Sequence, residues 1–280
     1  YYVGLNFSPV DAALHTQAQH LLVDFRIPHH AKPAEWVGGR TIIQLMVICA
    51  AIYLARSSYL MPIVAVPFVV ALTLTIAQWM SGSYTLALLF PWRISIFLMP
   101  LSSAILVGVF LSNVLNKYEQ FIERHQRSWQ IASAVLLAIM TLKGGYNAVR
   151  LFQKPIEGRS DSVEFVRATY REGDVVLIPP QLDSFRLAAQ VPVFVDFKSH
   201  PYQDQEVIEW YKRYQLAQEY YEGKGEAPCA ALEQIVKQYG VNRVVLRNAN
   251  DLMPSSPQNC GSLEQQFSGK YLSVYIVKST

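Results

Sequence analysis

The stretch that decides the fold is Ile94–Asn116, which has the sequence ISIFLMPLSSAILVGVFLSNVLN and contains 23 residues without a charged side chain. A helix crosses the hydrocarbon core of a bilayer with roughly 20 predominantly apolar residues, within a range of about 17–25. Pro100 lies inside the stretch, and membrane helices tolerate proline because neighbouring groups satisfy the freed carbonyl. We therefore expect a transmembrane helix here.

The uncharged run on its N-terminal side, Ser57–Trp92, has 36 residues, which is too many for one crossing. We assign Tyr59–Trp79 to a second span, which ends at the break Met80-Ser81-Gly82-Ser83. The remaining stretch Thr85–Phe90 is too short to cross a bilayer. It ends at Pro91, so we expect it to be re-entrant or to lie at the interface.

Two shorter uncharged stretches, Thr41–Ala55 and Ser128–Leu142, have 15 residues each and are bounded by arginine or lysine at both ends. Such side chains snorkel to the headgroups, and Trp36 and Trp129 occupy positions typical of interfacial aromatic residues. We expect both stretches to span the membrane, which gives about four transmembrane helices. The alternative for each is a buried helix of a soluble core.

The distribution of charge divides the chain. Thr41–Leu142 holds seven charged side chains in 102 residues, while the other 178 residues hold 38, and the whole chain has a net charge of +3. This split excludes a single soluble domain, a disordered chain and a nucleic-acid binder with a basic face. We expect a transmembrane helical region over residues 1–154, with the lipid bilayer as its partner, followed by a soluble domain over residues 155–280. Because the sequence begins with Tyr1, we also expect it to be a fragment.

From Pro155 onward the pattern is that of a small α/β domain. Ser160 or Asp161 is expected to cap the first helix, and the alternation of helices and strands favours a mostly parallel sheet. No glycine-rich phosphate loop follows any strand, which argues against nucleotide binding. The expected helices are 161–170, 182–190, 204–221 and 229–239, and the expected strands are 174–178, 191–197, 242–246 and 271–277.

Arg93 is the first candidate for a binding residue, because it stands alone between two long uncharged runs. A guanidinium there is either a snorkelling anchor or a contact to a lipid-linked phosphate, whose geometry it suits. The segment Arg26-Ile-Pro-His29-His30 is a second dense group of hydrogen-bond donors just before a span. It could bind a phosphate or a sugar, and the alternative is an interfacial loop that holds polar side chains near the headgroups. Its histidines match no zinc-ligand spacing, so we expect no metal.

In the soluble domain, Arg186 follows the Pro-Pro turn and Lys198 closes the expected second strand, beside Asp196 and His200. Ligands of open α/β sheets bind at the C-terminal ends of strands, so Arg186 and Lys198 are candidate substrate contacts. The alternative is a role in packing or in a salt bridge. No arrangement typical of a nucleophilic enzyme is present, so the catalytic residues and any cofactor are unassigned.

The three cysteines bear on the side of the membrane. Cys49 lies in the first span, while Cys229 and Cys260 lie in the soluble domain. The latter two could pair if that domain faces an oxidising compartment and would be free thiols in the cytoplasm. With four spans, seven basic residues near the membrane share a side with the C-terminal domain and four lie opposite. This count favours a cytoplasmic domain by a small margin.

Several motifs together resemble the C-terminal part of an uncharacterised family of bacterial multi-span membrane proteins. In the first half they are Arg26-Ile-Pro-His29-His30 and Pro91-Trp92-Arg93. In the second half they run from Pro179-Pro180 to Phe185-Arg186, through Val191–Lys198, to Glu209-Trp210-Tyr211. That family is in turn similar to the GT-C superfamily of membrane glycosyltransferases, which use polyprenyl-phosphate-linked sugars.

The resemblance implies sugar transfer from a lipid-phosphate donor, an inner-membrane location and a C-terminal domain outside the cytoplasm, against the charge count. The catalytic carboxylates of those enzymes lie upstream of anything present here, so no catalytic residue is carried over. The alternative is a non-enzymatic transporter or assembly component whose soluble domain docks a partner.

Overall fold

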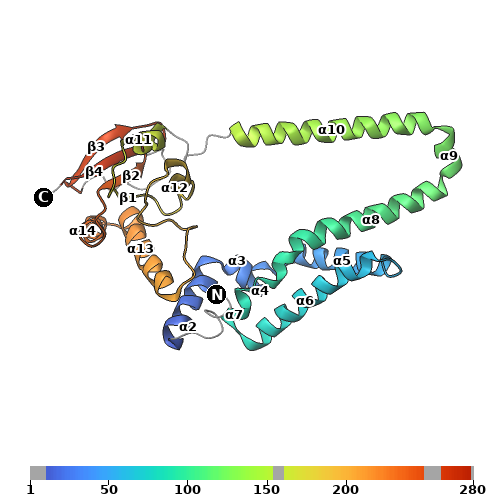
Figure 1. Ribbon diagram of the computed structural model, residues 1–280, viewed down its shortest axis with the longest axis horizontal. Coiled ribbons are helices and arrows are strands. Elements are labelled where there is room, and N and C mark those ends of the chain that lie inside the picture. The colour runs from blue at the N-terminus through green and yellow to red at the C-terminus, as the bar shows by residue number, and fades with distance from the viewer. Residues whose placement is uncertain (1–10, 154–160, 249–259, 279–280) are drawn as a thin grey trace. The chain divides into compact units, whose positions relative to one another are not determined.

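The structure is a computed structural model, and it describes residues 11–153, 161–248 and 260–278. The chain divides into two compact units, Tyr1–Phe152 (unit 1) and Gln153–Thr280 (unit 2). Figure 1 shows the helices of unit 1 and the mixed helices and strands of unit 2. Each unit is described by itself below.

Unit 1 begins with a succession of short helices. These are α2 (Ala12–His20), the π-helix η1 (Leu21–Arg26), α3 (Pro28–Ala31) and α4 (Pro33–Trp36). Asp11 caps α2, because its Oδ1 atom accepts hydrogen bonds from the backbone N–H groups of Ala13 and Leu14 at 3.0 and 3.1 Å. Pro28 and Pro33 each begin a helix, where the missing N–H costs nothing.

Long apolar helices follow. They are α5 (Gly39–Leu54), α6 (Leu60–Ser81), α7 (Tyr84–Ala87), the 3-10 helix η2 (Pro91–Ile94), α8 (Ser95–Lys117), α9 (Glu119–Arg124) and α10 (Gln126–Gln153). Three segments are long and apolar enough to cross a membrane, Leu60–Ser81, Tyr84–Lys117 and Gln126–Leu151, and α5 is a shorter apolar helix. Gly82 ends α6 in the left-handed conformation, with φ of 62°, at the break expected from the sequence. The predicted membrane helical region is confirmed, and the chain is a multi-span membrane protein.

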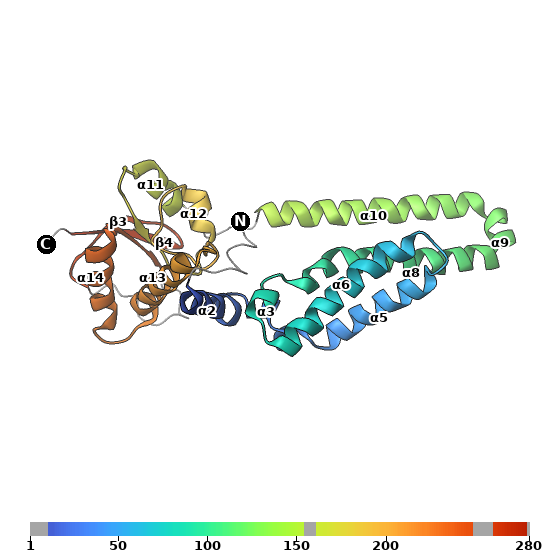
Figure 2. The same cartoon turned by 60° about the horizontal axis from the view of Figure 1, so that its bottom comes forward.

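Helices α5, α6 and α8 lie side by side (Figure 2) and share one apolar core. Ile48 and Ala51 of α5 pack there with Val64 of α6 and Leu98 of α8, and all four are buried. The outer faces of these helices expose large apolar side chains, as expected for surfaces that a bilayer covers. Helix α10 differs, because none of the residues in its most apolar 18-residue window is buried within the protein.

Unit 2 contains a small sheet with helices. Its elements are α11 (Asp161–Thr169), β1 (Val176–Leu177), α12 (Ser184–Ala189), α13 (Asp204–Glu222), α14 (Ala227–Tyr239), β2 (Arg243–Arg247), β3 (Leu263–Ser268) and β4 (Leu272–Val277). The strand order is β1-β2-β4-β3. The predicted α/β domain after the membrane helices is therefore confirmed.

The prediction of a mostly parallel sheet is wrong. Only β1 and β2 pair in parallel, while β4 pairs antiparallel with both β2 and β3. Strand β3 was not expected, because its sequence Leu-Glu-Gln-Gln-Phe-Ser is largely polar and exposed, as an edge strand permits. The short connection from Ser268 to Leu272 makes β3 and β4 a hairpin, which requires antiparallel pairing.

The expected strand Val191–Phe197 does not form. In this segment the structure has one parallel bridge, between Val176 and Val193, and two backbone hydrogen bonds to Val176. Pro192 has no N–H to donate, so a regular ladder cannot continue through it. Lys198 and Asp196 therefore do not lie at the C-terminal end of a strand, as the sequence had predicted.

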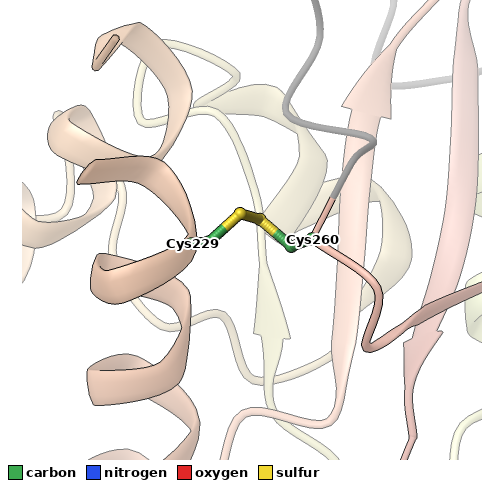
Figure 3. The surroundings of a disulfide bond; sticks show 2 residues. All are labelled: Cys229 and Cys260. Carbon is green, nitrogen blue, oxygen red and sulfur yellow. A yellow bond between two sulfur atoms is a disulfide. The ribbon is translucent and has the colours of Figure 1, made fainter. Parts of the chain in front are cut away.

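Cys229 in α14 and Cys260, just before β3, form a disulfide bond (Figure 3). The bond joins residues that are 31 positions apart in the sequence. A loop of this size gives a stabilisation of about 2–4 kcal/mol, in the view that the bond restricts the unfolded chain. It ties α14 to the sheet.

Arg243 of β2 carries a buried charge that pairs with a carboxylate, although its Nε atom has no hydrogen-bond partner among the described residues. Its Nη2 atom lies 2.9 Å from Oδ2 of Asp174, and both side chains are almost fully buried. Its guanidinium also donates to the hydroxyl and the carbonyl oxygen of Thr169, at 2.8 and 2.6 Å. Asn242 donates to the other carboxylate oxygen of Asp174 at 2.7 Å, so both oxygens of this carboxylate have partners.

We expect Arg243→Ala to destabilise unit 2 by about 3–5 kcal/mol, because it leaves the buried carboxylate of Asp174 without its cation. Thermal melting of the purified full chain, followed by near-UV circular dichroism, measures the effect. The control is Lys237→Ala, which removes an ion pair with Glu233 that is exposed to solvent and therefore contributes little to stability. Equal melting temperatures of the two variants would contradict the account.

Candidate functional site

Two of the sequence motifs meet in one pocket of unit 1, which we call the Arg93 pocket. The histidines come from α3 and Trp36 ends α4, while the other residues belong to the turn that leads into α8 and to the first residues of α8. The pocket has a volume of about 230 Å³. Its lining residues are His29, His30, Trp36, Phe90, Trp92, Arg93, Ser95 and Ile96.

Aromatic packing fixes the position of Trp92 in this pocket. Its ring stacks on that of Trp36, with 5.8 Å between centroids and 5° between planes, and the ring of Phe68 meets it edge-on at 6.3 Å. Phe90 has a φ of 48°, which is a left-handed conformation that bulky residues rarely adopt. Strain of this kind persists only where the surroundings enforce it. The turn therefore holds Trp92 and Arg93 in a set orientation.

The pocket offers hydrogen-bond donors and positive charge, and none of its lining residues is acidic. The indole Nε1–H of Trp92 is buried and has no hydrogen-bond partner among the described residues. An indole N–H can only donate, and leaving it buried without an acceptor costs free energy. Arg93 is exposed, and within the described part of the chain no carboxylate pairs with it. An anion would satisfy both groups.

The pKa of His30 depends on the positive charges around the pocket. Burial lowers its pKa below the ordinary value of 6.5, and the positive charges of His29, Arg93 and Arg26 lower it further. Arg26 therefore acts on the pocket through its charge, although it is not one of the lining residues. Protonation of His30 costs stability, and this cost appears as the pH falls below the ordinary value. A bound anion in the pocket would instead favour the protonated form of His30 and raise its pKa.

Asp24, in the π-helix η1, belongs to a separate polar network. It pairs with Lys32, and its Oδ2 atom lies 3.0 Å from Nε2 of His20 and accepts a hydrogen bond from the Tyr84 hydroxyl at 3.1 Å. Burial alone would raise the pKa of Asp24, but the hydrogen bonds from Lys32 and Tyr84 outweigh it and lower that pKa. The acidic side chain nearest in sequence to Arg26 is thus already neutralised by Lys32.

Unit 2 holds a second cavity, of about 450 Å³, which we call the Trp210 cavity. Of the sequence-predicted residues Arg186 lines it, together with Asp196, whereas Lys198 does not and instead pairs with Asp183. The full lining is Arg186, Val193, Phe194, Val195, Asp196, Ser199, Pro201, Gln205, Glu206, Glu209, Trp210 and Arg213.

Trp92 and Trp210 were not among the site residues predicted from the sequence. Trp92 precedes the predicted binding residue Arg93, and Trp210 follows Glu209, which lines the Trp210 cavity. This adjacency in the sequence was the available signal. Whether an indole N–H is satisfied depends on contacts between distant segments. Trp210 donates to the carbonyl oxygen of Asp196 at 3.0 Å, while Trp92 has no such partner among the described residues.

Comparison with known proteins gives one match. Residues 160–217 match the model of a family described as a domain of unknown function, DUF6798. All residues that line the Trp210 cavity lie within this segment. No curated protein and no solved structure matches the chain, and no link to glycosyltransferases follows from these comparisons. The fold and the match together define a polytopic membrane protein whose α/β unit contains a segment similar to this uncharacterised domain.

We expect Arg93→Gln to raise the pKa of His30 toward its ordinary value, because the substitution removes one of the charges that lower it. Histidine titration by NMR, with His30→Gln used to assign the signal, measures the shift. The control is Arg56→Gln at the end of α5, which the pKa of His30 should not sense. An unchanged pKa in Arg93→Gln would show that the two side chains are not neighbours.

Proposed function

We propose that this membrane protein binds the phosphate group of a lipid in the Arg93 pocket. The observation that carries the proposal is the buried, unsatisfied Nε1–H of Trp92 beside an Arg93 guanidinium that no described carboxylate neutralises. A guanidinium binds phosphate through two parallel hydrogen bonds, and the indole adds a third donor. The pocket lies at the start of the long apolar helix α8, where the headgroup of a lipid is within reach.

His29, His30 and Arg26 have supporting roles in this proposal. The two histidines line the pocket and can donate to phosphate oxygens, and Arg26 adds positive charge to the same region. A bound phosphate favours the protonated form of His30, so binding couples to proton uptake. A cluster of basic side chains between apolar helices is a common form of lipid-headgroup recognition.

We further propose that the lipid is a polyprenyl-phosphate-linked sugar and that the protein takes part in transferring the sugar. The resemblance of the motifs at Arg26–His30 and Pro91–Arg93 to a family similar to GT-C glycosyltransferases supports this step. The pocket supplies the binding of the anionic carrier. We assign no catalytic residue within the chain.

We also propose that the protein spans the inner membrane with unit 2 outside the cytoplasm. The support is the disulfide between Cys229 and Cys260, since disulfides persist in oxidising compartments and are rare in the cytoplasm. The basic residues counted near the membrane favoured the opposite side by a small margin. The disulfide is the stronger argument, because it is a property of unit 2 itself.

We expect Arg93→Lys to weaken the binding of polyprenyl monophosphate by roughly 1–2 kcal/mol, the order of a hydrogen bond to a charged group. An ammonium group can anchor a helix end but cannot reproduce the planar fork of the guanidinium. Binding is measured with the full-length protein in nanodiscs that contain the lipid. Arg56→Lys is the matched control, because Arg56 lies over the ring of Tyr53 at the end of α5. Equal affinity in wild type and both variants would reduce Arg93 to an anchor.

The side of the membrane is tested by thiol labelling of intact cells with an impermeant reagent. We replace Cys49 with serine, so that Cys229 and Cys260 are the only cysteines. Outside the cytoplasm, the pair resists labelling until a reductant is added to the intact cells. Labelling that appears only after lysis would place unit 2 in the cytoplasm.

A further inference from the structure

The Trp210 cavity has the composition of a ligand site that is independent of the Arg93 pocket. Its wall is formed by the segment 193–201 and one face of α13, and Arg186 of α12 stands at its edge. Its volume of about 450 Å³ falls within the range of about 300–1,000 Å³ that small-molecule sites occupy. Apolar side chains and a few polar groups share the lining.

The apolar side of the cavity is held rigidly. Trp210 donates its indole N–H to the carbonyl oxygen of Asp196 at 3.0 Å, and its ring packs against those of Tyr214 and Phe197, with centroids 5.9 and 6.3 Å away. Phe194 packs edge-on against Tyr239 at 5.0 Å. These contacts hold the buried side chains of Trp210 and Phe194 in place behind the cavity.

The carboxylate of Asp196 is the central polar group. Its side chain is 1% exposed. Oδ1 accepts a hydrogen bond from the backbone N–H of Ser199 at 2.6 Å, whereas Oδ2 accepts none from any described residue. The nearby Nη1 atom of Arg186 is 3.8 Å away, which is beyond hydrogen-bond distance. Arg186 therefore forms an ion pair with this oxygen but no hydrogen bond, and a hydroxyl group of a ligand would supply the hydrogen bond.

The charges around the cavity select the class of ligand. Glu209 and Arg213 pair with each other at 2.9 Å, and the guanidinium of Arg213 also lies over the ring of Tyr239, so these two are already satisfied. Arg186 and Glu206 remain at the edge, and both are exposed. Asp196 and Glu206 repel an anion, while Arg186 repels a cation. A neutral ligand can bind both the carboxylates and the guanidinium if its groups donate as well as accept hydrogen bonds. Hydroxyl groups have this property.

We propose that the Trp210 cavity binds a neutral sugar. Its hydroxyl groups donate to Oδ2 of Asp196 and to the carboxylate of Glu206, and Arg186 donates to a sugar oxygen after a shift of its half-exposed side chain. The site lies wholly within the segment that matches the uncharacterised domain, so the proposal assigns this domain a sugar-binding role.

The test uses the full chain in a sugar-free amphipathic polymer, because many detergents carry sugar headgroups. The probes are neutral disaccharides built on glucose, mannose, galactose and N-acetylglucosamine, with inorganic phosphate and tetralysine as charged comparisons. Saturation-transfer NMR identifies a binding disaccharide and calorimetry gives its affinity. We expect Asp196→Asn and Glu206→Gln each to weaken this affinity by about tenfold, the loss that accompanies one hydrogen bond to a charged group.

The matched control is Glu233→Gln, which removes an exposed carboxylate of α14 outside the cavity and should leave the affinity unchanged. If Asp196→Asn lowers the melting temperature, the exposed position Glu206 decides the outcome. The proposal fails if no disaccharide binds, if only phosphate or tetralysine binds, or if Glu206→Gln binds as tightly as wild type. Arg93→Lys should not affect this binding, so a failure here is distinct from a failure of the phosphate site.

Discussion

The structure of unit 1 depends on the constraint that a charged side chain between apolar helices needs water, a headgroup or a counter-ion. Arg93 is the only charged residue between Ser57 and Asn116, and it stands where the chain turns into α8. The left-handed conformation of Phe90 and the stacked rings of Trp36 and Trp92 fix that turn. The same packing that stabilises the helices therefore creates a positively charged pocket at their end.

Two of the buried polar atoms without a hydrogen-bond partner among the described residues lie in the two proposed sites. Around Arg243, Asp174 supplies an ion pair and Thr169 accepts two hydrogen bonds, although Nε of Arg243 has no partner among the described residues. In the Arg93 pocket, the N–H of Trp92 has no acceptor among the described residues. In the Trp210 cavity, an oxygen of Asp196 likewise has no donor. A donor without an acceptor favours an anion, and an acceptor without a donor favours a hydroxyl group.

The apolar helices could be predicted from the sequence because a segment of about 20 predominantly apolar residues is recognisable without knowledge of tertiary contacts. The sheet could not, since β3 is a polar edge strand and Pro192 interrupts a run of residues that otherwise resembles a strand. Arg93 and the histidines of α3 were predicted as binding residues one by one, but their meeting in one pocket depends on packing between distant segments. The indole groups were missed for the same reason, because the burial of a side chain depends on tertiary contacts.

The central claim is that the Arg93 pocket holds a lipid phosphate, and photoaffinity labelling tests it most directly. A polyprenyl phosphate with a diazirine next to its phosphate is incorporated into nanodiscs with the full-length protein, and labelled peptides are mapped by mass spectrometry. The account predicts labelling concentrated in residues 29–36 and 90–96, with loss of label when excess unmodified polyprenyl phosphate is added. Labelling spread evenly over the lipid-exposed faces of α5, α6 and α10, unaffected by the competitor, would contradict it.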